Sequence, residues 1–409
     1  MADLQILNAG YEGRDDAFER AEGNYIHRED GKRFLDLALG AGSLIMGHAD
    51  PDIVAAVQRQ VAAGTIYLQN SAQSHQLAEA LADFIPPVLP RYIFCNSGSE
   101  ATQRAVRYAR AATGKAVIAS FEGGWHGMNE WTLFENGRDF AIGEGRPFDG
   151  IPDIVSQASI CLPYNDISVL DYLIANADQI AAIIIEPIQG SNPQPKIGTY
   201  LHALMSSCRE HGILVIFDEL ISGFRLAPGG AAERMELMPD IACYGKILGG
   251  GLPMGMVAIS ENVHARTFGS ADKSMLTGGT FSANPLSCAA GMALLNRLES
   301  DAYRRLQILG DYFRRVVNKA LYDEGIPFHC DGVGSITRLY FCREEVKSRA
   351  DRDAKQISVV QQHVFNQAMR AQAVLWPSNG ILCHALTQNE TLYDALAVQI
   401  VVAAREVMN

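Results

Sequence analysis

The sequence has 409 residues, of which 48% are hydrophobic and 20% are charged, and its formal net charge at pH 7 is −12. This balance is typical of a globular protein with a large core and excludes an intrinsically disordered chain. The acidic charge argues against nucleic acid or an anionic membrane as the main partner.

The eight cysteines are scattered along the chain, and none forms a CxxC pair. Most lie inside apolar runs, which predicts free, buried thiols in a protein of a reducing compartment. No basic stretch followed by an apolar core is visible at the start, and no apolar run approaches the roughly 20 residues that span a bilayer. We therefore expect a soluble, cytoplasmic protein without a signal peptide.

The first predicted element is a β-hairpin in residues 23–37, where Asp30-Gly31 supplies the turn. In the middle of the chain, short apolar runs typical of buried strands alternate with helical periodicity. Strand–helix alternation predicts an α/β fold with a mostly parallel sheet covered by helices on both faces. The predicted strands are 116–121, 180–185, 213–217 and 256–260, and the predicted helices are 100–112, 199–211 and 286–298.

The C-terminal part differs from this alternation. Helical patterns at 303–323 and 356–372 surround a strand in "SITRLYF", and a last helix begins at about residue 391. We expect a large domain at residues 51–300 and a smaller α+β domain built from both ends of the chain, residues 1–50 and 301–409.

The segment "FCNSGSEA" predicts an anion site at a helix start. Ser97 and Glu100 have the spacing of a capping box, and Gly98 lets a ligand approach the backbone. Free N–H groups and the helix dipole favour a phosphate there. The alternative is an ordinary capped helix, which the same residues also fit.

The segment "FEGGWHG" follows a predicted strand. Trp125 fits a platform for stacking an aromatic ring in the crevice where α/β sheets bind ligands. The alternative is an anchor in the core or in an interface. His126 alone is typical of a hydrogen-bonded structural histidine, and we expect no catalytic role on that basis.

Asp218 ends the apolar run "ILVIFD", where its carboxylate needs a charged partner unless it only caps a loop. Lys246 follows the apolar run "IACY" and precedes three glycines, a place where a desolvated amine becomes nucleophilic. A P-loop is excluded because no Ser or Thr follows this lysine.

A single ligand would satisfy these predicted sites together if it had a phosphate for the loop at Gly98, an aromatic ring for Trp125, a protonatable nitrogen for Asp218 and an aldehyde for Lys246. Pyridoxal 5′-phosphate (PLP) has all four groups.

These motifs resemble the class III PLP-dependent aminotransferases, and within them the glutamate-1-semialdehyde aminomutase branch. The resemblance covers about residues 36–294 and rests on "NSGSEA", "FEGGWHG", "IIIEP", "FDELISGFR", "PDIACYGKILGGGLPMG" and "GGTFSANPL". It implies the fold type I of PLP-dependent transferases and a homodimer whose active sites lie between the subunits.

The resemblance also implies roles for single residues. Lys246 would form a Schiff base with the cofactor aldehyde, and Asp218 would pair with the ring nitrogen. Gly98 and Ser99 would hold the phosphate, Trp125 and Leu220 would cover the two ring faces, and Thr280 would reach the phosphate of the neighbouring subunit's cofactor. Glu186 matches a strand-end glutamate of the family, to which we assign a supporting role.

The chain departs from the family pattern at its substrate-binding positions. The N-terminal segment of the aminomutases that binds the substrate carboxylate has no counterpart in residues 4–18, and no switching arginine occurs in "NGILCHALTQNE". Arg225 fits either a substrate-binding residue or a structural ion pair.

Three functions remain open from the sequence. The first is an aminotransferase in which Lys246 moves protons between the substrate and the cofactor and Asp218 keeps the ring nitrogen protonated. The second is an aminomutase or racemase that uses the same groups without releasing the intermediate. The third is a non-catalytic member of the fold, against which the intact Lys246 and Asp218 motifs argue.

Overall fold

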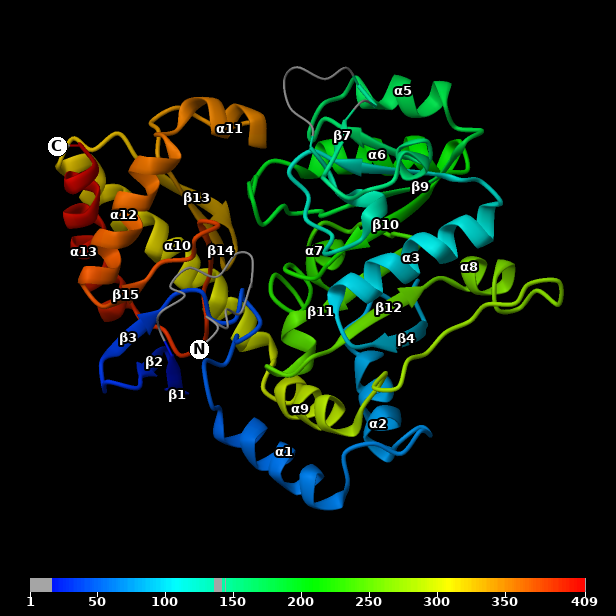
Figure 1. Ribbon diagram of the computed structural model, residues 1–409, viewed down its shortest axis with the longest axis horizontal. Coiled ribbons are helices and arrows are strands. Elements are labelled where there is room, and N and C mark those ends of the chain that lie inside the picture. Colours follow the sequence, from blue (N-terminus) through cyan, green and yellow to red (C-terminus); the bar gives the residue numbers. More distant parts are fainter. Residues whose placement is uncertain (1–16, 136–141, 144, 409) are drawn as a thin grey trace, which may run out of the picture.

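The computed structural model describes residues 17–135, 142–143 and 145–408, and its centre is a seven-stranded sheet (Figure 1). Four neighbouring pairs in this sheet are parallel, and β12 alone runs antiparallel to both of its neighbours. The predicted α/β class with a mostly parallel sheet is therefore confirmed. The strand order is β4 (Arg91–Cys95), β12 (Gly255–Ile259), β11 (Ile241–Gly245), β10 (Leu214–Asp218), β9 (Ile180–Ile185), β5 (Val117–Phe121) and β8 (Ser159–Leu162).

Both faces of this sheet are buried, which explains why its strands are apolar without alternation. Ile184 and Ile216 pack toward α3 (Gly98–Thr113), whereas their neighbours Ile183 and Val215 belong to the core on the other face. The remaining helices of this part are α1 (Pro51–Ala63), α2 (Ala72–Leu81), α4 (Asp153–Ser156), α5 (Val169–Ala175), α6 (Gly198–Glu210), α7 (Gly230–Arg234), α8 (Glu261–Arg266) and α9 (Pro285–Leu295), with the short helices η1 (Glu130–Thr132) and η2 (Lys246–Gly249) and the strand pair β6 (Phe134–Glu135) and β7 (Arg146–Pro147).

The two ends of the chain share a second region, on the left of Figure 1. The hairpin of β2 and β3 is confirmed, and β15 from the C-terminal part pairs in parallel with β3 through Val374 and Leu35. A separate hydrophobic core joins Leu35 and Leu37 to residues between 309 and 407. The elements are β1 (Phe18–Glu22), β2 (Tyr25–Arg28), β3 (Arg33–Asp36), α10 (Ser300–Asp323), β13 (His329–Val333), β14 (Ile336–Tyr340), α11 (Arg349–Lys355), α12 (Val359–Ala371), β15 (Val374–Leu375), β16 (Ile381–Cys383) and α13 (Glu390–Met408).

One predicted helix is misplaced at its start. The pattern at 356–372 corresponds to α12, which begins only at Val359 because Ser358 and Gln361 form a capping box there. The sequence segment before it forms a separate helix, α11. The expectations about residues 4–16 lie outside the described residues, and the domain boundaries at 50 and 300 stay a prediction.

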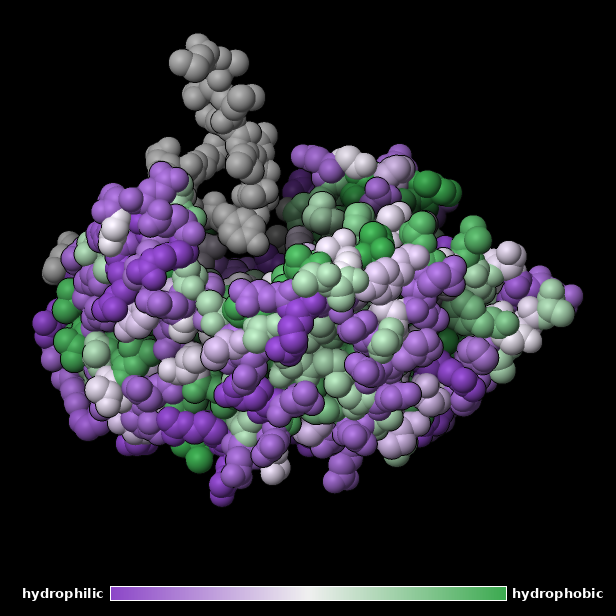
Figure 2. All heavy atoms as spheres, turned by 90° about the horizontal axis from the view of Figure 1, so that it is seen from below, coloured by the Kyte–Doolittle hydropathy of each residue, from purple (hydrophilic) through white to green (hydrophobic). Residues whose placement is uncertain are grey.

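The surface and the cysteines agree with a globular chain. Hydrophilic side chains cover much of the face seen in Figure 2, with hydrophobic ones interspersed among them. All eight cysteines are free and buried, as expected from their apolar surroundings. Within the described residues, no helix has the length and apolar character needed to cross a bilayer.

Candidate active site at the ends of three strands

Three chemically active side chains follow three adjacent parallel strands. Glu186 comes after β9, Asp218 ends β10, and Lys246 comes after β11. The register pairs Phe217 with Ile185 and Asp218 with Cys243. Because the carboxyl ends of parallel strands meet at one edge of the sheet, all three residues lie at the edge where α/β sheets bind ligands.

Asp218 forms a buried pair with His126. The side chain of Asp218 is buried, and its Oδ2 lies 2.7 Å from Nδ1 of His126, which is equally buried. A carboxylate can only accept, so the imidazole donates from Nδ1. The other oxygen of Asp218 accepts the Leu220 N–H at 3.0 Å. Asp218 therefore has the partner that its burial requires and caps the following loop as well, whereas sequence reasoning assigned His126 only a general structural role.

The far nitrogen of the same imidazole has no partner. Nε2 of His126 is buried and makes no hydrogen bond among the described residues. The N–H of Trp125 donates to Oε1 of Glu186 at 2.8 Å, and Gly190 donates to Oε2 at 2.9 Å. Burial first, and the nearby charge of Asp218 second, raise the pKa of Glu186. Glu186 thus joins residues 122–129, which we call the tryptophan loop, to the loop after β9.

Lys246 has an unusual backbone and an unpaired amine. Its φ is 45°, in the left-handed region that costs a non-glycine residue roughly 1 kcal/mol or more. Its side chain is partly buried and has no hydrogen-bond or ion-pair partner in the part of the chain that the structure describes. The glycines after it turn against α9, since a Cβ on Gly250 would lie 2.7 Å from the carbonyl oxygen of Ala290. The lack of a side chain at Gly250 therefore allows close packing against α9.

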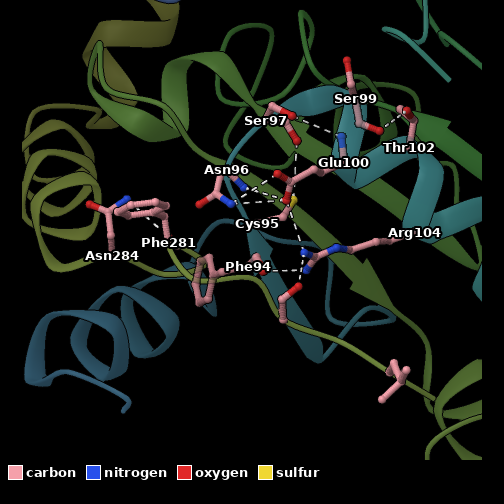
Figure 3. Close-up of polar contacts among 12 residues, drawn as sticks. Phe94, Cys95, Asn96, Ser97, Ser99, Glu100, Thr102, Arg104, Phe281 and Asn284 are labelled. Atoms are coloured by element: carbon pink, nitrogen blue, oxygen red, sulfur yellow. Dashed lines mark hydrogen bonds and ion pairs between the residues drawn. The ribbon is translucent and has the colours of Figure 1, made fainter. Parts of the chain in front are cut away.

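The start of α3 is where the sequence predicts an anion site, and we call residues 96–99 the anion loop (Figure 3), although its binding of an anion stays a prediction. Ser97 caps the helix by accepting the Glu100 N–H at 3.2 Å. The carboxylate of Glu100 accepts from the Asn96 N–H and not from Ser97, so the expected capping box is only half formed. The hydroxyl of Ser99 accepts the Met128 N–H at 3.0 Å, which joins the anion loop to the tryptophan loop.

The predicted ring-contacting residues lie close to this edge. Leu220 is buried against two glycines: a Cβ on Gly98 would lie 2.6 Å from its Cδ1, and a Cβ on Gly245 would lie 2.7 Å from its Cδ2. The side chain of Trp125 is 59% exposed, so it is available to a ligand. The predicted roles of Leu220 and Trp125 in covering the ring stay predictions.

Thr280 lies on a different part of the chain. It is exposed in the segment between α8 and α9, which extends outward after α8 and then runs back along the molecule to α9 (Figure 1). Arg104 fixes this segment to α3 by donating to the Gly278 carbonyl oxygen at 2.7 Å. The exposure of Thr280 leaves it accessible to a second molecule.

Arg225 connects distant parts of the chain by hydrogen bonds, and no ion pair of it occurs among the described residues. Its buried guanidinium donates to the carbonyl oxygens of Gly42 at 2.5 Å and His384 at 2.8 Å, and to Ser335 Oγ at 3.4 Å. These partners come from both ends of the chain. Among the described residues the expected carboxylate partner is therefore replaced by backbone carbonyls, and the role of Arg225 stays a prediction.

Sequence reasoning missed one further buried cation, Arg338 in β14. The signal was available, because "SITRLYF" places an arginine inside an otherwise apolar strand, where an unpaired charge is costly.

Comparisons with known proteins agree with this architecture. The family model described as aminotransferase class-III matches residues 11–368. A glutamate-1-semialdehyde 2,1-aminomutase from Thermomicrobium roseum is 35% identical over 88% of this chain and 83% of its own length. One from Methanosphaera stadtmanae is 38% identical over 80% of this chain and 76% of its own length.

Solved structures give the same picture. An omega-transaminase from Sphaerobacter thermophilus superposes with a TM-score of 0.90 at 30% identity, covering 99% of this chain and 93% of that one. A β-phenylalanine aminotransferase from Variovorax paradoxus superposes with a TM-score of 0.84 at 26% identity, covering 95% and 87%.

Proposed function

The chain belongs to the class III aminotransferase family, and from this we propose that Lys246 and Asp218 carry an amino-group transfer at the edge of β9, β10 and β11. The enzyme moves an amino group between an amine or amino acid donor and a keto or aldehyde acceptor. The observation that carries the site assignment is the Lys246 amine, unpaired among the described residues, at the end of the strand next to the one that ends in Asp218, which is itself paired with His126.

Pyridoxal 5′-phosphate is the cofactor, and the residues at this edge fit its groups. Asp218 supplies a buried carboxylate for a protonated ring nitrogen, and Lys246 supplies an amine for the aldehyde. The N–H groups of Gly98 and Ser99 at the start of α3 supply the donors that a phosphate needs. Trp125 and Leu220 supply apolar surface for the ring. When bound, the cofactor acts as an electron sink for the substrate carbon that bears the amine.

Lys246 has two tasks in this proposal. Its amine would hold the cofactor through the aldehyde carbon and would be displaced there by the amine of a substrate. Once free, its Nζ would take the proton from the substrate carbon as general base and, as general acid, would deliver it to the cofactor carbon that had carried the aldehyde. The left-handed backbone conformation at Lys246 sets the direction in which its side chain leaves the main chain.

The other polar residues at the edge position these groups. His126 donates to Asp218 and so fixes the orientation of that carboxylate. Glu186 holds the backbone of Trp125, and so its indole, at a fixed distance from the end of β9. Ser99 joins the anion loop to the same tryptophan loop.

An intramolecular aminomutase or racemase is the second candidate. The curated relatives at 35% and 38% identity are aminomutases, which favours this alternative. Both reactions use the same residues, and they differ in whether the intermediate leaves. Incubation with one substrate and no acceptor separates them: isomer formed beyond one equivalent of enzyme supports the aminomutase or racemase.

The decisive experiment tests the bond at Lys246. The enzyme loaded with PLP should show the violet absorption band of a bound aldehyde, and borohydride followed by peptide mapping should find the cofactor fixed on Lys246. Lys246→Ala should lose this fixation and amino transfer together. Lys319→Ala is the matched control, because Lys319 is an exposed lysine on α10. A colourless loaded enzyme, or a label on another lysine, would contradict the proposal.

The chain is further proposed to work as a homodimer with Thr280 reaching the partner's phosphate site. The exposed segment of Thr280 supports this, as does a surface hollow of about 540 Å³ between that segment and α3.

The large domain is residues 51–300, and the small one is residues 1–50 with 301–409. The free, buried cysteines support a reducing compartment such as the cytoplasm. The net charge of −12 supports small-molecule partners over nucleic acid or membranes.

A further inference from the structure

Arg338 lies on the face of a small sheet that looks toward the proposed active site. In β14, Leu339 packs into the core of the small region, whereas Ile336 packs into the core of the large region. Side chains alternate along a strand, so Arg338 shares the face of Ile336 and Tyr340. The hydroxyl of Tyr340 donates to Asn192 at 2.7 Å, in the loop that follows Glu186.

A second contact places the same face of the small sheet next to the loop that follows β9. Ile381 in β16 is the cross-strand partner of Arg338, and its Cδ1 lies 3.2 Å from an ideal Cβ on Gly190. That same Cβ would lie 3.7 Å from Oε2 of Glu186 and 2.6 Å from Cδ1 of Ile221. Arg338 is therefore one strand away from residues that touch the end of β9.

The guanidinium of Arg338 has one edge without a partner. Its side chain is buried, and Nη1 donates to the Asn379 carbonyl oxygen at 2.7 Å. Nε is buried without a hydrogen bond, and no bond from Nη2 occurs among the described residues. The Nε and Nη2 donors form the fork that binds a carboxylate through two parallel hydrogen bonds.

The acids near Arg338 do not neutralise it. Asp331 stands opposite Arg338 on β13, yet among the described residues no ion pair within 4.0 Å joins them, and Asp331 accepts from Gly332. Asp353 accepts from Arg352, and Glu122 accepts from the Ala350 N–H. Burial, with the nearby charge of Arg352, lowers the pKa of the Arg338 guanidinium. A buried cation without a counter-charge is costly, and a bound anion removes that cost.

We infer that Arg338 binds the carboxylate of the substrate through its Nε–Nη2 edge, which makes the substrate an amino acid or oxo acid and not a simple amine. This inference rests on the proposed function, because it names the substrate class for the same site. Arg225 does not offer the same fork: its Nε is also unpaired, but its Nη2 already donates to the Gly42 carbonyl oxygen.

The test compares acids with their neutral amides. Enzyme loaded with PLP is mixed with alanine, β-alanine, 4-aminobutyrate or β-phenylalanine, and with the carboxamide of each, while loss of the violet band is followed. The wild type should react at least tenfold faster with its best acid than with the matching amide. Arg338→Met should lower the rate with that acid roughly 10- to 100-fold and leave the amide rate within about threefold.

Two variants serve as controls. Arg338→Lys keeps the charge but loses the fork, so it should give an intermediate rate with the acid. Arg343→Met removes an exposed arginine near the end of the same strand and should change neither rate. Binding of 3-phenylpropanoate, which has no amine to transfer, gives a second readout by calorimetry and should weaken at least tenfold in Arg338→Met alone.

The outcomes separate the two proposals. Equal wild-type rates with acids and amides would overturn the role of Arg338, and so would an equal loss of both rates in Arg338→Met. Either result leaves the amino-transfer chemistry intact. Failure of every donor to bleach the band, together with the absence of a borohydride label on Lys246, would instead overturn the proposed function and this inference with it.

Discussion

Three carboxylates are buried at the ends of the neighbouring parallel strands β9 and β10, and each is stabilised in a different way. Asp218 is paired with His126, and Glu186 accepts two backbone N–H groups. Glu219 accepts from Ser222 and from the N–H groups of Ala231 and Ala232. Only the first has a partner that can carry a positive charge, which fits a carboxylate that must stay ionised in front of a protonated nitrogen.

Replacement of Asp218 tests this distinction. Asp218→Asn keeps the shape but removes the negative charge, so we expect amino transfer to fall by about 10² to 10⁴ while the Lys246 label persists. Asp240→Asn is the matched control, because Asp240 is partly buried but lies at the opposite end of the sheet, where it accepts the Val215 N–H. Equal losses in both variants would show that the effect is structural.

Glu219 makes stability depend on pH. Burial raises the pKa of its carboxyl from 4.5 to about 7, so the folded chain holds a proton there that the unfolded chain has already released. Stability must therefore fall as the pH rises from about 4.5 to 7. Glu219→Gln should remove this fall, gaining up to about 3 kcal/mol on the wild type between pH 5 and pH 8 in denaturant titrations. A difference between the two proteins that does not change with pH would contradict this.

Single residues could be predicted when their own strand placed them. Asp218 and Lys246 were found because each follows an apolar run, and such runs end at the ligand-binding edge. The partner of Asp218 was not found, because His126 belongs to a loop 92 positions away and only the folded sheet brings the two together. The carbonyl partners of Arg225 are still more distant in sequence and leave no local pattern at all.

At the level of elements, the predicted strands were correct to within about one residue. β9 was predicted with its exact bounds "Ile180–Ile185", since its apolar run is sharply delimited. The direction of β12 was not predictable, because an apolar run looks the same read in either direction. Its antiparallel course places Gly255 under the anion loop, where a Cβ would lie 2.2 Å from the Ser97 carbonyl oxygen.

Gly127 tests how tightly the loops at this edge are packed. Its φ is +74°, and a Cβ would lie 2.9 Å from the Cα of Ser99. Gly127→Ala should therefore push the anion loop away and weaken PLP binding by tenfold or more, measured by titration of the absorption band. Gly114→Ala is the control, since its φ of +75° brings the same strain of roughly 1 kcal/mol with nothing within 4 Å. Equal PLP affinities in the two variants would refute the packing argument.

At the level of the whole molecule, the second region is assembled from both ends of the chain. The sequence predicted this from a change of pattern on either side of the middle, but the parallel pairing of β15 with β3 was not predictable. Two residues of pairing, at Val374 and Leu375, leave too short a signal in the sequence. Arg225 adds a second connection, because it bonds to carbonyls near both ends.

The proposed homodimer can be tested by complementation. Thr280→Glu places a negative charge where the partner's phosphate is expected, and Lys246→Ala removes the amine, so each variant alone should be nearly inactive. A heterodimer of the two has one site with an intact Lys246 and an intact Thr280. Mixed and reassociated subunits should regain about a quarter of wild-type activity. Lack of recovery, with heterodimers demonstrated, would place Thr280 outside the neighbouring site.

The pairing of β3 with β15 also governs how the chain matures on the ribosome. Leu35 is synthesised more than three hundred residues before its neighbour Val374. Until Val374 is made, the nascent β3 therefore has an open edge and an unburied apolar face, the features that chaperones bind and that lead to misassembly when they meet another chain.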